Sequence, residues 1–339
     1  MGVSVKDVAA RAGVSVGTVS NVLNHPQRVT PATRTKVQRA IEQLGFTRNT
    51  VASALARGDT RTIGLVVVGL SNSLFVDLAR GAQQAARADD RHLRLAMAED
   101  DHELLREHIR VMAGSSASGL LVAPMADVSA EVAQVRAMGS PVVVLNYDSG
   151  ARDTCRVLVD NEQVGYLAAR HLIALGHRRI GLVAPDDLLQ PVALRRKGVV
   201  RAVEETLGAV HLEDFRLASL DPQGGAEVAH AIVGRPARER PDGVIGVSDL
   251  LAMAVIGELR SAGLRVPEDV AVLGCDHNSA AWGGAVPLTS VTMEGETMGA
   301  EGVRLLLREL REPAADHVHT TVMLEPRLLA KESTIGRSR

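Results

Sequence analysis

The sequence predicts an all-α headpiece containing a helix-turn-helix, followed by an α/β core of two doubly wound parallel-sheet lobes. Two observations support this fold class. Within the first sixty residues, short amphipathic helices alternate with glycine breaks. From residue 62 onward, short apolar runs alternate with amphipathic segments, a pattern typical of parallel sheets covered by helices on both faces.

The length and composition allow this organisation. A chain of 339 residues with 46% hydrophobic residues can form a small module and a larger bilobed one. No apolar run approaches the roughly 20 residues that a membrane span requires, and the N-terminus lacks the apolar region of a signal peptide. The two cysteines, Cys155 and Cys275, are far apart, which argues against a disulfide framework. We expect a cytoplasmic protein with no membrane partner.

The net charge of −2 is distributed unevenly along the chain. Residues 1–60 carry eight Lys or Arg and three acids, a balance of +5, which leaves 30 basic and 37 acidic residues, or −7, for the rest. A basic region at one end of an acidic body is typical of nucleic-acid binding by that end. Charge alone is equally consistent with a basic, solvated surface.

The start of the chain contains the parts of a helix-turn-helix. Ser4 opens a Ser-x-x-acid pattern that can cap a first helix, and Gly13 ends that helix. Ser15 can cap a second helix that runs to about Asn24. The glycine-containing turn between the two helices is typical of the motif.

The second helix has two different faces at 100° per residue. Its core face holds Thr18, Val19, Val22 and Leu23. Its other face holds small or uncharged polar residues, namely Val16, Gly17, Ser20, Asn21 and Asn24. Such a face suits the major groove of DNA, where Asn21 can pair with adenine and Val16 can contact a thymine methyl group. The alternative is an amphipathic surface helix, although such helices usually carry Lys and Glu on their exposed side.

A third helix and a short Ala-rich segment complete this region. The third helix is expected between Thr30, as its cap, and Gly45, and its Arg34 can contact phosphates without selecting a base sequence. Residues 49–58 are too few to form a stable helix alone in water. We therefore expect this segment, whose largest side chain is Leu55, to be disordered until it pairs with something.

The core is expected to contain alternating strands and helices. Strands are predicted at 63–68, 93–98, 120–123, 142–145, 156–159, 180–184, 244–247 and 270–274. Helices are predicted at 75–90, 102–114, 129–138 and 162–176. Roughly 280 residues of this pattern suit two doubly wound lobes better than one.

Polar residues follow many of these strands at the edge where open parallel sheets bind ligands. They are Ser71, Asn72, Asn146, Asp160, Asn161, Asp186, Ser248, Asp249 and Asp276. Each of them alone is more simply explained as a turn or helix-cap residue. Together, a ring of carboxylates and amides suits the hydroxyl groups of a polyol.

The headpiece resembles that of the LacI/GalR (lac repressor) family of transcriptional regulators. The matching stretch runs from Val5 to Asn24, and Thr33-Arg34, Leu44-Gly45-Phe46 and the spacing of Asn49, Ala52 and Leu55 continue it. The resemblance implies base-reading positions at Val16, Gly17 and Asn21, and two hinge helices that pair across a dimer and insert Leu55 into the minor groove. We expect DNA contacts from Ser4, Ser15, Val16, Gly17, Thr18, Ser20, Asn21, Asn24, Arg34, Asn49, Ala52 and Leu55. This sequence departs from the family where Asn21 replaces a frequent Arg and Arg48 replaces a proline.

The core resembles the effector domain of the same family, which has the type I periplasmic-binding-protein fold. The matching stretches are 62–67, 71–75, 159–161, 171–180, 267–274 and 287–291. The resemblance implies effector contacts from Asn72, Phe75, Asp160, Arg195, Asp249 and Asp276. Departures occur at Ser248, Cys275 and His277, and the aromatic residues that sugar-binding members often have near Leu220 and Gly295 are missing.

The same resemblance implies the domain boundaries. The headpiece would comprise 1–48, the hinge helix 49–60 and the bilobed core 61–339. Lobe 1 would contain about 62–161 and 292–322, and lobe 2 about 162–291 and 323–339.

We therefore expect a nucleoid-associated bacterial regulator, a repressor, that binds a palindromic operator as a homodimer or higher oligomer. A small-molecule effector, a sugar or sugar derivative, would control it, and we expect neither a cofactor nor enzymatic activity. Two alternatives stay open: a DNA-binding protein with a degenerate, ligand-independent core, and an enzyme acting on a sugar-like ligand.

The histidines do not predict a metal site. His102 and His108 are six residues apart, so they point in different directions from a helix and cannot share a metal. His317 and His319 can face one way on a strand, but two ligands without a third are more simply explained as surface residues.

Overall fold

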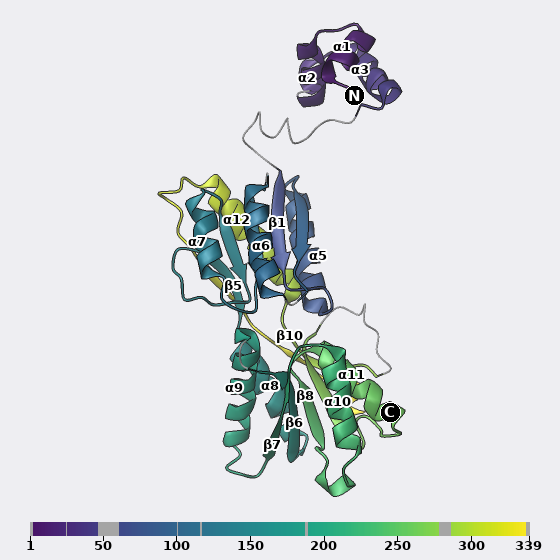
Figure 1. Cartoon of the computed structure of the whole chain (residues 1–339), viewed down its shortest axis with the longest axis vertical. Helices are drawn as coiled ribbons and strands as arrows, with labels where there is room; N and C mark the ends of the chain where they lie inside the picture. Colours follow the sequence, from purple (N-terminus) through teal and green to yellow (C-terminus); the bar gives the residue numbers. More distant parts are fainter. Residues whose placement is uncertain are drawn as a thin grey trace. The chain divides into compact units, whose positions relative to one another are not determined.

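The computed structural model describes residues 3–24, 26–46, 61–99, 101–115, 117–186, 189–277 and 286–336. The chain divides into two compact units, Met1–Asp59 and Thr60–Arg339, and each is described by itself (Figure 1). Within the described residues, no helix is both long enough and apolar enough to cross a membrane.

The headpiece consists of α1 (Val5–Ala12), α2 (Val16–Asn24), a 3-10 turn η1 (Pro26–Arg28) and α3 (Pro31–Leu44). The predicted caps are confirmed: Ser4 forms a capping box with Asp7, and Thr30 caps α3. Gly13 and Gly45 end α1 and α3 in the left-handed backbone conformation that glycine adopts at no steric cost. The small core contains Val8, Ala9, Val19, Val22, Val37 and Ala40.

Lobe 1 contains a six-stranded sheet in the order β11-β5-β4-β3-β1-β2, in which all pairs are parallel. Its strands are β1 (Thr62–Val67), β2 (His92–Met97), β3 (Gly119–Ala123), β4 (Val142–Leu145), β5 (Cys155–Val159) and β11 (Thr321–Leu324). Its helices are α5 (Ser73–Ala88), α6 (His102–Gly114), α7 (Ser129–Ala137) and α12 (Gly295–Arg311). Leu65 belongs to the core that α5 and α12 cover, and its neighbour Val66 belongs to the separate core of α6 and α7, because successive side chains of a strand point to opposite faces.

Lobe 2 contains a second six-stranded sheet in the order β12-β10-β9-β8-β6-β7, parallel except for the β10–β12 pair. Its strands are β6 (Arg179–Pro185), β7 (His211–Leu217), β8 (Gly243–Gly246), β9 (Ala271–Asp276), β10 (Thr289–Thr292) and β12 (Leu328–Leu329). Its helices are α8 (Asn161–Ala174), α9 (Gln190–Glu204), α10 (Pro222–Val233), η2 (Ala237–Glu239), α11 (Asp249–Ser261) and α13 (Glu332–Ile335). Figure 1 shows helices on both sides of each sheet.

The fold class predicted from the sequence is confirmed. Each of the eight predicted strands is present within two residues of its expected ends, and the four predicted helices are present as well. The prediction missed β7, β10, β11 and β12. Strands β7, β11 and β12 lie at sheet edges, where one neighbour is missing and the apolar run that marks a buried strand is not required.

In each lobe, a glycine lets two neighbouring helices pack closely. In lobe 1, a Cβ atom on Gly299 of α12 would overlap the carbonyl oxygen of Leu78 on α5. In lobe 2, a Cβ atom on Gly198 of α9 would overlap the carbonyl oxygen of Glu162 on α8. Glycine therefore lets the backbones of two helices pack directly together in each lobe.

The chain passes between the lobes three times. The passages lie between β5 and α8, between β10 and α12, and between β11 and β12. The ends of β1, β4 and β5 in lobe 1 therefore meet the ends of β6, β8 and β9 in lobe 2, which brings the predicted polar residues together.

Candidate DNA-binding face and interlobe cleft

Helix α2 presents the face that the sequence predicts for DNA. Val19 and Val22 are buried, whereas Val16 is 46% exposed and Gly17, Ser20 and Asn21 are exposed. Ser15 caps the helix by accepting the N–H of Thr18 at 3.1 Å. These exposed residues form one face of α2 without a charged side chain, and on it the amide of Asn21 can hydrogen-bond a base edge in the major groove.

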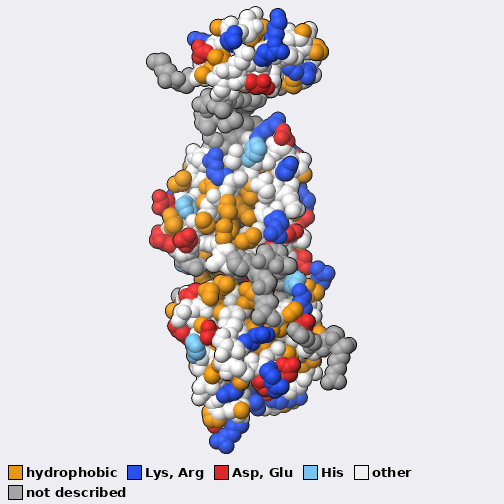
Figure 2. Space-filling model, turned by 90° about the vertical axis from the view of Figure 1, so that its right-hand side faces the viewer, with side chains coloured by type: hydrophobic (Ala, Val, Ile, Leu, Met, Phe, Trp, Pro, Cys, Tyr) orange, Lys and Arg blue, Asp and Glu red, His pale blue; other side chains and the backbone are white. Residues whose placement is uncertain are grey.

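Thr18 and Arg34, which are also predicted to contact DNA, make hydrogen bonds within the headpiece. Thr18 is half-buried, and its hydroxyl lies 2.9 Å from that of Ser15, so it belongs to the cap of α2 as well as to the predicted contact set. Arg34 on α3 is exposed and donates from Nη2 to the carbonyl of Pro26 at 2.8 Å, which orients it beside the η1 turn. Figure 2 shows several Lys and Arg side chains on the headpiece surface. The side chain of Asn24 and the predicted hinge residues Asn49, Ala52 and Leu55 lie outside what the structure describes.

A cleft of about 300 Å³ lies between the two lobes. Lobe 1 lines it with Val68, Gly69, Ser71, Asn72, Phe75, His102 and Met125. Lobe 2 lines it with Pro185, Asp186, Leu189, Ala218, Ser219 and Leu220. A mostly apolar wall with a few polar groups at this volume is typical of small-molecule sites.

Asn72 connects this cleft to a buried polar network. Its side-chain oxygen caps α5 by accepting the N–H of Leu74 at 2.9 Å, and its Nδ2 donates to Oδ2 of Asp276 at 3.1 Å. Asp276, only 1% exposed, is the last residue of β9 in lobe 2. This hydrogen bond therefore joins the lobes next to the cleft.

Arg195 of α9 lies at the centre of the network. Its Nη1 donates to Oδ1 of Asp276 at 3.1 Å, its Nε donates to Oδ1 of Asn161 at 2.9 Å, and Nη1 also donates to the carbonyl of Val247. Asn161 in turn donates to Oδ1 of Asn146 in lobe 1 at 3.0 Å. Burial raises the pKa of Asp276, whereas Arg195, the Asn72 amide and the Asp249 N–H lower it by binding the charged form.

Asp249 belongs to the same buried region. Its N–H donates to Oδ2 of Asp276 at 3.4 Å, and its Oδ1 accepts the hydroxyl of Ser290 at 2.6 Å. The preceding residue, Ser248, caps α11. The structure thus brings together Asn72, Phe75, Arg195, Asp249 and Asp276, five of the six residues expected to contact an effector.

Asp160 is the exception. Its side chain is exposed and caps α8 by accepting the N–H of Gln163 at 2.9 Å. The next residue, Asn161, is 4% exposed and bonds to Arg195 instead. The sequence places both residues directly after β5, and the family resemblance indicates Asp160 as the effector contact. In the structure the two side chains point in different directions, and it is Asn161 that joins the Arg195 network.

The comparisons with known proteins agree with this architecture. Residues 4–49 match the bacterial regulatory proteins of the lacI family, and residues 169–334 match the periplasmic binding protein-like domain. The HTH-type transcriptional repressor PurR of Aliivibrio fischeri (strain MJ11) is 27% identical over 336 residues, which cover 98% of this chain and 99% of that protein. This chain belongs to the LacI family of regulators.

Two solved structures extend the comparison. A complex of the transcriptional regulator CelR with cellobiose is 29% identical, with a TM-score of 0.68 over 98% of this chain and 99% of that one. A lac repressor dimer bound to operator and the anti-inducer ONPF is 23% identical, with a TM-score of 0.81 over 98% of this chain and 99% of that one. The second likeness shows the common fold of a LacI-type headpiece and core. The protein is therefore a DNA-binding transcription regulator, and membership in a family of regulators agrees with the expectation that it is not an enzyme.

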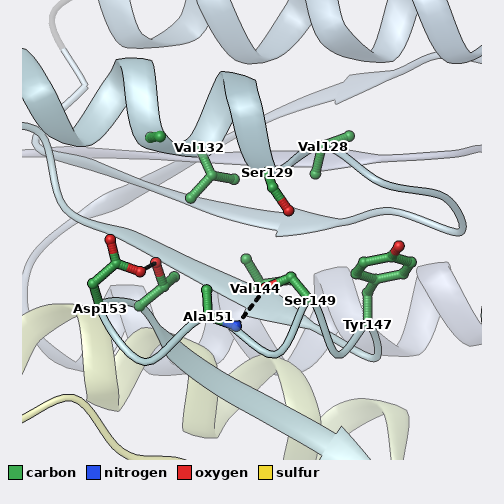
Figure 3. A pocket seen from close by; sticks show the side chains of 10 residues that line it. Val128, Ser129, Val132, Val144, Tyr147, Ser149, Ala151 and Asp153 are labelled. Atoms are coloured by element: carbon green, nitrogen blue, oxygen red, sulfur yellow. Dashed lines mark hydrogen bonds between the residues drawn. The ribbon is translucent and has the colours of Figure 1, made fainter.

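Two other places in this LacI-family chain do not fit an effector or a reactive site. A cavity of about 30 Å³ lies between the start of α7 and the segment after β4, lined by Val128, Ser129 and Tyr147 among others (Figure 3). That volume holds little more than one or two water molecules, so it is too small for an effector. Cys275 beside Asp276 is buried, and burial raises the pKa of its thiol to about 12, so it is not a reactive nucleophile.

The expectation that His317 and His319 are surface residues without a third ligand nearby was wrong. His317 and His319 are not two isolated ligands on a surface, because Cys155 and Glu309 lie beside them. All four side chains are in lobe 1, away from the residues that line the interlobe cleft.

Proposed function

We propose that this protein is a repressor that binds a two-fold symmetric operator as a homodimer and releases or tightens it when a small molecule enters the interlobe cleft. The observation that carries this proposal is the Asn72–Asp276 hydrogen bond, which joins the lobes at the wall of the cleft. A molecule bound there contacts both lobes, so it can favour one arrangement of the lobes over another.

The similarity of this chain to the lac repressor supports the proposed dimer and the two-fold symmetric operator. The lac repressor compared above is a dimer on its operator, and this chain has the same fold. A single headpiece reads a short half-site, so a dimer with two-fold symmetry selects a palindromic sequence. The hinge at 49–60 would then pair with its twin, which is the expectation that the family resemblance gives.

A sugar or sugar derivative is the proposed class of effector. The CelR structure holds cellobiose, and CelR is 29% identical to this chain. The cleft offers hydroxyl and amide groups from Ser71, Asn72 and Ser219 and a carboxylate from Asp186, which can bind sugar hydroxyls. Among the described residues that line the cleft, Phe75 is the one Phe, Tyr or Trp, which favours a small effector with little ring surface to stack.

The predicted effector contacts then fall into two groups. Asn72 and Phe75 line the cleft and would contact the effector directly. Arg195, Asp249 and Asp276 are buried behind Asn72, and they would act by holding it or by accepting effector hydroxyls after the lobes move. Asp160 stays a prediction of the family resemblance.

The experiment has two steps. Genomic binding sites of the full-length protein are selected in vitro, and their sequences show whether a palindrome is preferred. Thermal unfolding is then measured with a panel of mono- and disaccharides, and operator titrations are repeated with any sugar that raises the Tm. An asymmetric preferred site contradicts the dimer proposal.

The alternative of a ligand-independent core makes a different prediction. In that case the operator is bound normally, but no sugar raises the Tm or changes operator affinity. The missing aromatic residues near Leu220 and Gly295 favour this alternative.

A further inference from the structure

Four metal-binding side chains meet at one point of lobe 1. Cys155 begins β5, Glu309 lies on α12, and His317 and His319 lie on the connection from α12 to β11. One ligand atom from each of them lies within 4.8 Å of all the others. Cys155 is far from the other three residues in sequence, so the packing of α12 and β11 against β5 is what brings it to them.

The site is enclosed. The Cys155 side chain is fully buried, and the side chain of His317 is 2% exposed. The side chains of Glu309 and His319 are 12% and 19% exposed. Low exposure of four polar ligands favours a permanently bound ion over a transient surface contact.

Glu309 has a buried oxygen without a hydrogen bond. Its Oε1 accepts Nη1 of Arg136 at 2.9 Å. Its Oε2 has no hydrogen-bond partner among the described residues, although it points toward Nε2 of His317 at 3.6 Å and Nδ1 of His319 at 4.0 Å. An orphaned buried carboxylate oxygen is costly, and a cation at the centre of the cluster would satisfy it.

The distances match those of ligands around a tetrahedral zinc ion. Zinc bonds of about 2.3 Å to sulfur and about 2.0–2.1 Å to nitrogen at a tetrahedral angle place sulfur and nitrogen about 3.5 Å apart. Sγ of Cys155 lies 3.4 Å from Nε2 of His317 and 3.7 Å from Nδ1 of His319. The carboxylate oxygen lies 3.6 Å and 4.0 Å from the two histidine nitrogens, and all four ligand atoms lie within 4.8 Å of one another, so the cluster must contract around the ion to complete the tetrahedron.

The surrounding groups also suit a metal. Nδ1 of His317 lies 2.6 Å from Oε2 of Glu312, so a carboxylate holds this ring with Nε2 free to face the ion. A carboxylate behind a metal-binding histidine is common in zinc proteins. Arg136 donates to Nε2 of His319 at 3.1 Å, and this bond would have to open when Nδ1 binds zinc, because Nε2 then carries the proton.

We propose that Cys155, Glu309, His317 and His319 form a structural zinc site that joins β5 to α12 and to the connection before β11. A thiolate, a carboxylate and two neutral imidazoles supply a charge of −2 to Zn²⁺, so the buried site is neutral once the Cys155 thiol has lost its proton to solvent. Thiolate and imidazole ligands select zinc over magnesium or calcium, which prefer oxygen. Four protein ligands leave no open position, so the ion is structural and takes no part in catalysis.

The first test measures the metal directly. The untagged full-length protein is expressed in zinc-supplemented medium and purified without chelators, and its metal content is determined by mass spectrometry. We expect zinc equimolar with the chain. After removal of the zinc, added Co²⁺ should give a thiolate-to-cobalt charge-transfer band and the intense visible bands of tetrahedral cobalt.

Variants distinguish this site from adventitious binding. Cys155→Ser should remove the thiolate-to-cobalt band, and His319→Gln, at the most exposed ligand, should weaken zinc binding without the risk of opening the core. Glu312→Gln should weaken zinc binding about 10- to 100-fold, as loss of a supporting carboxylate does elsewhere. Cys275→Ser and His211→Gln, in lobe 2, are the matched controls and should keep wild-type zinc affinity.

The opposing result is a metal-free network in which His317 hydrogen-bonds Glu312 and lies beside Glu309 with no ion between the four side chains. Protein without zinc, together with a cobalt spectrum typical of octahedral, water-bound ions, overturns the proposal. Wild-type zinc affinity in both Cys155→Ser and His319→Gln overturns it as well. Circular dichroism of each variant shows whether a loss of binding comes from the ligand or from unfolding.

Discussion

Asp276 divides its two carboxylate oxygens between the lobes: Oδ1 accepts Arg195 from lobe 2 and Oδ2 accepts Asn72 from lobe 1. The buried Asp276 carboxylate thus binds Arg195 inside lobe 2 and Asn72 on the other side of the cleft. The two roles separate in variants, because Arg195 and Asn72 bind different oxygens, although Oδ2 also accepts the N–H of Asp249.

The first prediction compares the loss of the contact between the lobes with the loss of the buried Arg195–Asp276 ion pair. Asn72→Ala removes two hydrogen bonds, the cap of α5 and the contact with Asp276, and should lower the free energy of unfolding by about 1–3 kcal/mol. Asp276→Asn leaves the buried Arg195 without its charged partner and should cost about 3–5 kcal/mol. Urea denaturation of both variants gives the values, and equal losses would show that the ion pair is not the stronger element. Asn72→Ala should also reduce the response of operator binding to an effector.

The second prediction concerns the exposed face of α2. Asn21→Ala should relax base preference at one symmetric pair of operator positions, at a cost of about 1–3 kcal/mol for each lost bidentate contact. Arg34→Ala should weaken binding to all sequences alike and reduce the salt dependence, since a phosphate contact carries no base information. Selection from a randomised operator library with each variant separates the two outcomes. The reverse pattern would mean that α2 presents another face to DNA.

The third prediction tests the backbone contact between α5 and α12. Gly299→Ala places a methyl group against the carbonyl of Leu78 and should destabilise the protein by about 1–3 kcal/mol. Gly257→Ala is the matched control, because that glycine lies in helix α11 and, among the described residues, only the backbone around it in α11 lies within 4 Å of an added Cβ. The control should stabilise the protein by about 0.5–1 kcal/mol, as replacement of a helical glycine by alanine does. Thermal unfolding of both variants decides the sign of each effect.

The fourth prediction concerns pH. His171 is half-buried on α8 and its Nε2 lies 2.8 Å from the hydroxyl of Thr334 in α13; burial lowers its pKa below the ordinary value of 6.5. The unfolded chain therefore binds a proton more readily than the folded one, so stability should fall as the pH drops below about 6.5 and be full above it. His171→Gln should flatten this decline in denaturation curves measured from pH 5 to 8. Burial also lowers the pKa of His177, so part of the dependence should persist.

Local patterns were sufficient to predict the fold class and the edge where the cleft lies. Apolar strands such as β1 and β3 are buried on both faces, and this leaves a continuous hydrophobic run in the sequence. The polar residues after those strands meet because parallel strands end at one edge. Asn72, Asp249 and Asp276 were found in this way.

Properties that depend on tertiary packing could not be predicted. Asp160 and Asn161 are equivalent in a sequence pattern, and only the start of α8 determines that the first caps the helix while the second bonds to Arg195. Cys155 and His317 are separated by 162 residues, so no spacing rule connects them. Their proximity depends on the pairing of β11 with β5, and β11 itself was not predicted because it lies at the edge of its sheet.

The three passages of the chain between the lobes affect the order in which the protein can be completed on the ribosome. Strand β5 ends at Val159, but β11, which covers its outer edge, ends at Leu324, after nearly all of lobe 2 has been synthesised. At about 5–20 residues per second, roughly 8–30 s of synthesis separate the two strands. During that interval the edge of β5 has no neighbour, and an unpaired strand edge attracts other chains. The nascent protein is thus most exposed to aggregation at the edge that the last passage of the chain closes.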